Sequence, residues 1–197
     1  MNLYHSPVTN LLPQSDFAVA LSDVILSVGT FVFGMTIKPT SRSKIWTVLF
    51  SLLSLAAGLG AIYHGLNRFH TREFWVLVST TTTASAFLFL SAVLTMYKPQ
   101  SKIFAWWWPL FGLAGLLVGG ILSPFPFWYI SAVSGVCLLI SILLLIRSPQ
   151  KSARNWILIG IALTLIGLVL QKTSGNVVFH YVQLAANGCF WLGAKRT

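Results

Sequence analysis

The chain has 197 residues, of which 56% are hydrophobic and only 8% are charged. A soluble domain carries about a quarter charged residues because its surface faces water, so this composition excludes an ordinary soluble protein and indicates a surface that faces lipid. The formal net charge of +10 would indicate a nucleic-acid partner in a soluble protein. Here the basic residues stand in short gaps between apolar stretches, where membrane topology explains them better, so we expect no nucleic acid.

Seven stretches are long and apolar enough to cross the hydrocarbon core, which requires about 20 residues. Together they form a single all-α domain over residues 1–197, a polytopic bundle of seven transmembrane helices. The expected spans are Asp16–Ile37, Ile45–Leu66, Phe74–Met96, Ile103–Leu122, Phe125–Ile146, Asn155–Lys172 and Asn176–Ala194. The sixth is apolar only to Leu170 and takes in Lys172 by snorkelling. The gaps are short, so neighbouring helices are expected to run antiparallel.

Lysine and arginine are divided unequally between the two sides of this bundle. One side carries ten of them, which are Lys38, Arg42, Lys44, Lys98, Lys102, Arg147, Lys151, Arg154, Lys195 and Arg196. The other side carries Arg68, Arg72 and Lys172. The richer side is expected to be cytoplasmic, which places the N-terminus outside and the C-terminus in the cytoplasm. We expect an integral, multi-pass protein of a bacterial inner membrane or an equivalent membrane.

Asp23 is the most unusual residue of the first span. An ionised carboxylate in a bilayer costs several kcal/mol unless it is paired, protonated or bound to a metal. Ser27 lies one turn further along the same face. One interpretation is a protonated Asp23 that hydrogen-bonds between helices and fixes their packing. The other is a catalytic, metal-binding or ion-conducting role.

The seventh span carries a polar stripe at the spacing i, i+4, i+7 and i+11, made of Asn176, His180, Gln183 and Asn187. Such a stripe either hydrogen-bonds between helices or lines a site, and the imidazole of His180 favours a site. His64 ends the second span on a face with the small residues Ala57, Gly60 and Ala61, which lets another helix approach closely.

Other polar residues give weaker signals. The third span contains a cluster of serine and threonine residues between 79 and 85, whose hydroxyls can bond to their own helix and thus indicate packing. Glu73 stands at the mouth of that span and either pairs with a nearby arginine or acts as a base.

Depth brings three of these residues together. At about 1.5 Å per residue, Asp23, His64 and His180 all fall within about 12 Å of the outer boundary. Two imidazoles and a carboxylate form a donor set that zinc accepts while keeping a position open for water. The same set also suits non-haem iron.

The sequence resembles the CREST superfamily, which includes alkaline ceramidases and the progestin and adiponectin receptors. The resemblance covers the whole chain in topology, and in residues it is carried by ALSDVILS (Ala20–Ser27), AAGLGAIYHGL (Ala56–Leu66) and NVVFHYVQLAANGCFWLGAKR (Asn176–Arg196). It implies a seven-helix fold and zinc-dependent hydrolysis of a lipid amide or ester, with His64 and His180 as zinc ligands and Asp23 as a supporting residue.

The sequence departs from the superfamily pattern at three places. Gly60 stands where a serine usually precedes the second-span histidine, and Asn176 stands where a second histidine usually lies on the seventh span. Glu73 is the only acid near the position of the usual aspartate in the third span.

Two functions follow as expectations. The first is a zinc-dependent hydrolase near the outer face, with Asp23 or Glu73 as general base and a lipid substrate that arrives sideways from the bilayer. The alternative is a non-catalytic protein with a degenerate metal site, which binds or senses a lipid or small molecule or serves as a subunit of a membrane complex. Bis-histidine haem binding and ion transport rank below both. The sequence names no protein partner.

Overall fold

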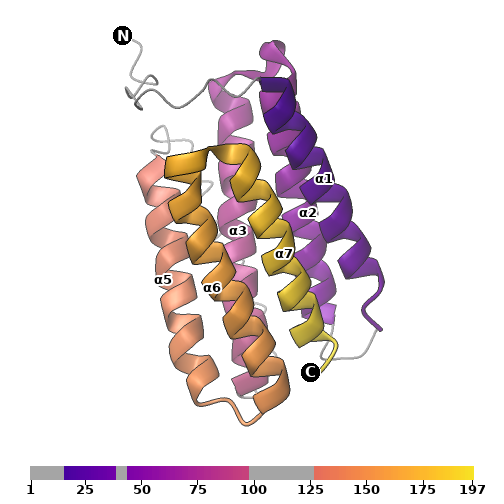
Figure 1. The fold of residues 1–197 in the computed structure, drawn as a ribbon, viewed down its shortest axis with the longest axis vertical. Coiled ribbons are helices and arrows are strands. Elements are labelled where there is room, and N and C mark those ends of the chain that lie inside the picture. Colours follow the sequence, from indigo (N-terminus) through magenta and orange to yellow (C-terminus); the bar gives the residue numbers. More distant parts are fainter. Residues whose placement is uncertain (1–15, 39–43, 98–126) are drawn as a thin grey trace.

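The structure is a computed structural model that describes residues 16–38, 44–97 and 127–197, and these parts are helical (Figure 1). No strand occurs in them. The elements are α1 (Asp16–Met35), α2 (Lys44–Gly65), the short 3-10 helix η1 (Asn67–Phe69), α3 (Arg72–Tyr97), α5 (Phe127–Ile146), α6 (Lys151–Ser174) and α7 (Asn176–Ala194).

The all-α prediction is confirmed for these ranges, and six of the seven expected segments form helices with ends that shift by only a few residues. The expected span Ile103–Leu122 lies outside the described residues. One boundary was wrong: Lys151–Arg154, expected in a loop, forms the first turn of α6. The expected span began at Asn155 because the charged residues Lys151 and Arg154 before it do not belong to an apolar stretch. A helix can nevertheless extend beyond its apolar part, because long charged side chains can reach out of the hydrocarbon.

Four helices within the described ranges are long and apolar enough to cross a membrane, and they are Phe17–Met35, Lys44–Gly65, Arg72–Tyr97 and Lys151–Ser174. α5 contributes a shorter apolar segment, Ala132–Ile146. α7 falls outside this set because its polar stripe lowers its mean hydropathy. Large apolar side chains are also exposed along α1, with Phe17 75% and Met35 67% accessible. An apolar surface of this kind is typical of a protein that faces lipid.

The helices form one bundle in which α1, α3, α5 and α7 run in one direction and α2 and α6 in the other (Figure 1). α1 packs against both α2 and α7, and α6 packs along α7. A single residue, Gly175, separates α6 from α7 and has φ 85°. Glycine adopts this left-handed conformation without strain, which permits so abrupt a reversal.

The apolar core occupies the half of the bundle in which α2 begins and α3 and α7 end. Its largest rings are Trp46, Phe89 and Phe190, with centroids 6.1 Å apart for Trp46 and Phe89 and 4.8 Å apart for Phe89 and Phe190. Small residues let the helices approach closely there: a Cβ at Gly160 would lie 2.4 Å from the Phe190 ring. The other half of the bundle, in which α1 and α7 begin, contains the first buried polar residues of these two helices.

Candidate functional site

Asp23 of α1 and His180 of α7 are in contact in the interior of the bundle. Asp23 Oδ1 lies 3.2 Å from His180 Nε2, and the two residues are only 4% and 8% accessible. They meet because α1 and α7 run parallel and each residue lies near the start of its helix. The prediction that these two side chains lie close together is confirmed by this contact.

Ser22 holds the other side of the imidazole. Its Oγ lies 2.8 Å from His180 Nδ1 and donates to the carbonyl of Val19 at 2.7 Å. A hydroxyl carries one proton, so a Ser22 that donates to Val19 accepts from the Nδ1–H of His180. A neutral imidazole has only one N–H, and this arrangement therefore leaves Nε2 as a lone pair directed at Asp23.

A lone pair and a carboxylate oxygen 3.2 Å apart repel one another unless a positive charge or a proton lies between them. Three arrangements provide one. Asp23 carries a proton and donates it to Nε2, His180 carries a second proton and donates it to Asp23, or a metal ion binds both atoms. In each arrangement a proton or a cation lies between Asp23 Oδ1 and His180 Nε2.

The second carboxylate oxygen of Asp23 faces α2. Oδ2 is buried and has no hydrogen-bond partner among the described residues. It lies 3.2 Å from the position that a Cβ of Gly60 would occupy. Gly60 thus leaves room for the carboxylate and supplies no side-chain donor to it.

His64 lies one turn beyond Gly60 on α2 and is half-buried. The ring of Tyr63 packs beside it, with centroids 5.4 Å apart. Gly60 faces the Asp23 carboxylate, so His64 lies one turn further along the α2 face that is turned towards Asp23, and its expected meeting with Asp23 and His180 stays a prediction.

The remaining stripe residues bond to other partners. Asn176 Oδ1 accepts a 2.9 Å hydrogen bond from Gln171 of α6. Gln183 donates to Asn187 Oδ1 at 3.1 Å, and Asn187 Nδ2 donates to Thr30 Oγ1 of α1 at 2.9 Å. These bonds tie α7 to its neighbours, as the packing interpretation of the stripe expected.

Two further candidate residues lie apart from the pair. Ser27 donates to the carbonyl of Ser54 at 2.8 Å, so its hydroxyl links α1 to α2. Glu73 is exposed in the first turn of α3, where a negative charge is favourable at a helix N-terminus. Within the part of the chain that the structure describes, it makes no ion pair with His64 or His180.

The geometry fits a zinc ion in part. Zinc binds nitrogen and oxygen at about 2.0–2.2 Å, so two neighbouring ligands of a tetrahedral site stand roughly 3.4 Å apart, close to the spacing of the Asp23 and His180 atoms. The bond from His180 Nδ1 to Ser22 is the kind of support that metal-binding histidines have. However, over residues 16–38, 44–97 and 127–197 no three His, Cys, Asp or Glu side chains are arranged to hold a metal. Two donors are in place and the third is not.

Sequence reasoning missed Thr30 as the partner of Asn187 and did not select Ser22 as the partner of His180. Ser22 precedes Asp23, and Thr30 is seven residues further along the same helix face. A search for hydroxyls at helical spacing from Asp23 would have found Thr30. The parallel contact of α1 with α7, however, cannot be read from either segment alone.

Comparisons with known proteins give a family but no described relative. No curated protein and no solved structure matches the chain. One family model matches residues 18–197, and its description is a family of unknown function, DUF6962. Because this match covers nearly the whole chain and all of the helices described above, the protein belongs to the family DUF6962.

Proposed function

We propose that this protein is a membrane-embedded, zinc-dependent hydrolase whose metal is held by Asp23, His180 and His64. The observation that supports the proposal is the 3.2 Å approach of His180 Nε2 to a buried carboxylate oxygen of Asp23, while His180 Nδ1 is bonded to Ser22. This bond orients the ring, and a divalent cation satisfies Nε2 and the carboxylate oxygen at once. His64, half-buried one turn beyond Gly60 on α2, is the third donor of this proposal and would have to turn its imidazole towards the pair to bind the same ion.

A zinc ion held by Asp23, His180 and His64 would supply two effects, a lower pKa for a bound water and polarisation of a substrate carbonyl. Asp23 Oδ2 has no hydrogen-bond partner among the described residues, which makes it the acceptor best placed to take a proton from that water. Glu73, the other expected base, is exposed and has no described contact with the pair. Asp23 is therefore both ligand and base in this proposal.

A lipid substrate agrees with an apolar groove between α1 and α2. The groove has a volume of about 430 Å³ and is lined by Phe17, Ala20, Leu21, Val24, Ser27, Val28, Gly58, Ala61, Ile62, Gly65 and Leu66. Asp23 and Gly60 do not line the groove, but their sequence neighbours Val24 and Ala61 do. An acyl chain in the groove would bring an amide or ester near Asp23 from the bilayer, without passage through water.

We also infer seven membrane crossings, with the N-terminus outside and the C-terminus in the cytoplasm. α3 and α5 follow one another in the chain yet run in the same direction (Figure 1). This shared direction agrees with an odd number of crossings between them, which is what the expected span Ile103–Leu122, outside the described residues, would provide. Described Lys and Arg residues also gather at the end where α2 begins and α7 ends, which should be cytoplasmic. Reporter fusions after Thr197 and within 67–71 would test the orientation.

Zinc analysis of the purified protein tests the metal site. We expect about one zinc per chain in the natural protein, and loss of that zinc in Asp23→Asn and His180→Ala. Asn176→Ala is the matched control, since it removes a polar side chain from the same face of α7 outside the site. Folded protein without zinc, under conditions that retain zinc in a known metalloprotein, would overturn the proposal.

A second candidate is a non-catalytic binding or structural protein in which Asp23 and His180 share a proton and clamp α1 to α7. It is favoured by the absence of a three-donor metal group in the described ranges and by the helix-to-helix bonds of Asn176 and Asn187. It predicts zinc-free protein that binds a lipid and releases it unchanged. Lipid products that appear only when His180 is present would instead support the hydrolase.

A further inference from the structure

One end of the bundle carries basic residues and no acid. Its described cations are Lys38, Lys44, Arg147, Lys151, Arg154, Lys195 and Arg196. The chain has only three acidic residues. They are Asp16 and Asp23 in the first half of α1 and Glu73 at the start of α3, all towards the opposite end. The positive charge of this end therefore has no carboxylate side chain of the same chain to neutralise it.

Four of these cations converge on two helix ends. Lys151 and Arg154 lie in the first turn of α6, and Lys195 and Arg196 directly follow α7. The two helices almost touch there, because a Cβ at Gly193 would lie 3.1 Å from the carbonyl oxygen of Ala153. Lys151, Arg154, Lys195 and Arg196 therefore form one cluster, which we call the α6–α7 basic cluster.

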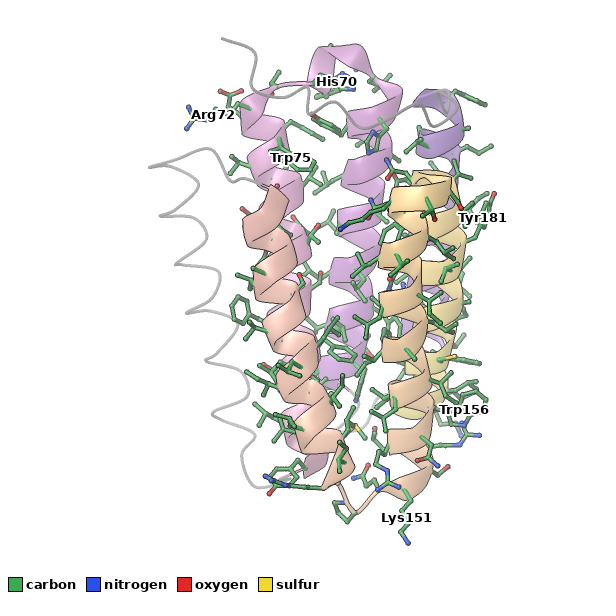
Figure 2. The ribbon with its side chains drawn as sticks, turned by 60° about the vertical axis from the view of Figure 1, so that its left-hand side comes forward. His70, Arg72, Trp75, Lys151, Trp156 and Tyr181 are labelled. Carbon is green, nitrogen blue, oxygen red and sulfur yellow. The ribbon has the colours of Figure 1, made fainter. Side chains whose placement is uncertain are left out.

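Two tryptophans hold part of this cluster at a definite depth. Lys195 Nζ lies 4.5 Å from the centre of the Trp191 ring, and Arg196 Cζ lies 5.4 Å from that of Trp156. Figure 2 shows Trp156 and Lys151 at the same end of the bundle, far from Arg72. Tryptophan in membrane proteins gathers at the level of the lipid headgroups, so the cations stand at that level too.

An apolar surface continues from the cluster into the membrane. Beyond Trp156, α6 exposes Ile159, Ile166 and Val169, which are 47%, 51% and 64% accessible and lie along one side of the helix. A ligand that fits both features has a phosphate at the cations and hydrocarbon along α6. This combination favours a phospholipid over a soluble phosphate compound, which would leave the apolar surface uncovered.

We propose that the α6–α7 basic cluster is a binding site for an anionic phospholipid, with the lipid phosphate held by Lys151, Arg154 and Arg196 and an acyl chain lying along α6. Arginine is suited to this role because its guanidinium presents several donors to phosphate oxygens. Arg196 uses one donor for the carbonyl of Leu192, at 2.8 Å, and keeps the others. The proposal depends on the membrane location of the chain and not on the zinc site.

The test measures binding of phosphatidylglycerol and phosphatidylcholine to the purified full chain in detergent by native mass spectrometry. Natural protein should retain phosphatidylglycerol in preference. Lys151→Gln with Arg154→Gln should weaken its binding roughly thirtyfold, since each cation near an anionic headgroup raises the affinity by roughly fivefold and the two factors multiply. The matched control, Arg68→Gln with Lys172→Gln, removes the same two charge types at the opposite end and should leave the preference unchanged.

Three results would overturn the proposal. They are equal binding of the two lipids by the natural protein, an equal loss in the control pair, and displacement of the lipid by millimolar inorganic phosphate, which would identify a soluble anion as the ligand. If the first double variant does not fold, Lys195→Gln with Arg196→Gln takes its place. Zinc content should be the same in all these variants, so the two proposals can fail separately.

Discussion

The interaction between Asp23 and His180 should be the strongest polar contact between α1 and α7. Both residues are buried, at 4% and 8% accessible, so solvent screens their interaction little. Neutral hydrogen bonds between membrane helices contribute about 0.6 kcal/mol on average and about 1.7 kcal/mol at most. Hydrogen bonds to charged groups contribute about 1.5–3 kcal/mol. A double-mutant cycle with Asp23→Ala and His180→Ala should therefore give a coupling free energy of about 1.5–3 kcal/mol if the pair is ionised or binds a metal.

The same two helices provide a matched control cycle. Thr30 and Asn187 are buried and joined by a neutral 2.9 Å hydrogen bond, so their coupling should be about 0.5–1.5 kcal/mol. Both cycles can be measured by unfolding the protein in mixed micelles of dodecyl sulfate and maltoside, first with a chelator and then with zinc. Zinc should raise the coupling of Asp23 with His180 and leave the control cycle unchanged. A coupling for Asp23 and His180 no larger than that of the control, with and without zinc, would refute the reasoning.

Two glycines give further predictions. Gly60→Ala places a methyl 3.2 Å from Asp23 Oδ2 and displaces the carboxylate. Zinc affinity, measured by equilibrium titration, should therefore fall roughly tenfold. Gly58→Ala is the control, because it adds the same methyl to the same helix away from Asp23 and should leave zinc affinity unchanged. Gly193→Val forces a Cβ to within 2.5 Å of an isoleucine side chain of α6 and should lower the free energy of unfolding by about 1–3 kcal/mol. A Cβ at Gly135 would have no described atom within 4 Å, so Gly135→Val should change the same unfolding free energy by less than about 0.5 kcal/mol.

The helices were predictable because hydrophobic length alone determines where a membrane helix can form. α7 begins and ends where the sequence indicated, at Asn176 and Ala194. The start of α6 was not predictable in this way, because Lys151 and Arg154 belong to the helix but not to its apolar part. Hydropathy indicates whether a segment lies in hydrocarbon or in water. Helical hydrogen bonds can continue across the boundary between the two, so hydropathy does not give the end of the helix.

The pairing of helices was only partly predictable. Short links imply that α1 packs against α2 and α6 against α7, since neighbours in sequence are usually neighbours in space. The contact of α1 with α7 joins opposite ends of the chain, and depth alone suggested it through Asp23 and His180. Depth gives one coordinate of a side chain, and the direction in which it points depends on helix rotation. For this reason Asn176 and Gln183 shared a predicted face with His180 but bond to other partners.

The position of α1 does not depend on Asp23 alone, and this bears on why an ionisable pair is present. Thr30 already holds α1 to α7 through Asn187, and Ser27 holds it to α2 through the carbonyl of Ser54. Replacing a buried charged pair by apolar residues of similar volume is often neutral or stabilising, so packing alone gives weak reason for a carboxylate and an imidazole here. The register of α1 has these other supports, and the second carboxylate oxygen of Asp23 faces a glycine, so the proposed role in binding a proton or a metal ion gives a reason for an ionisable pair that packing does not.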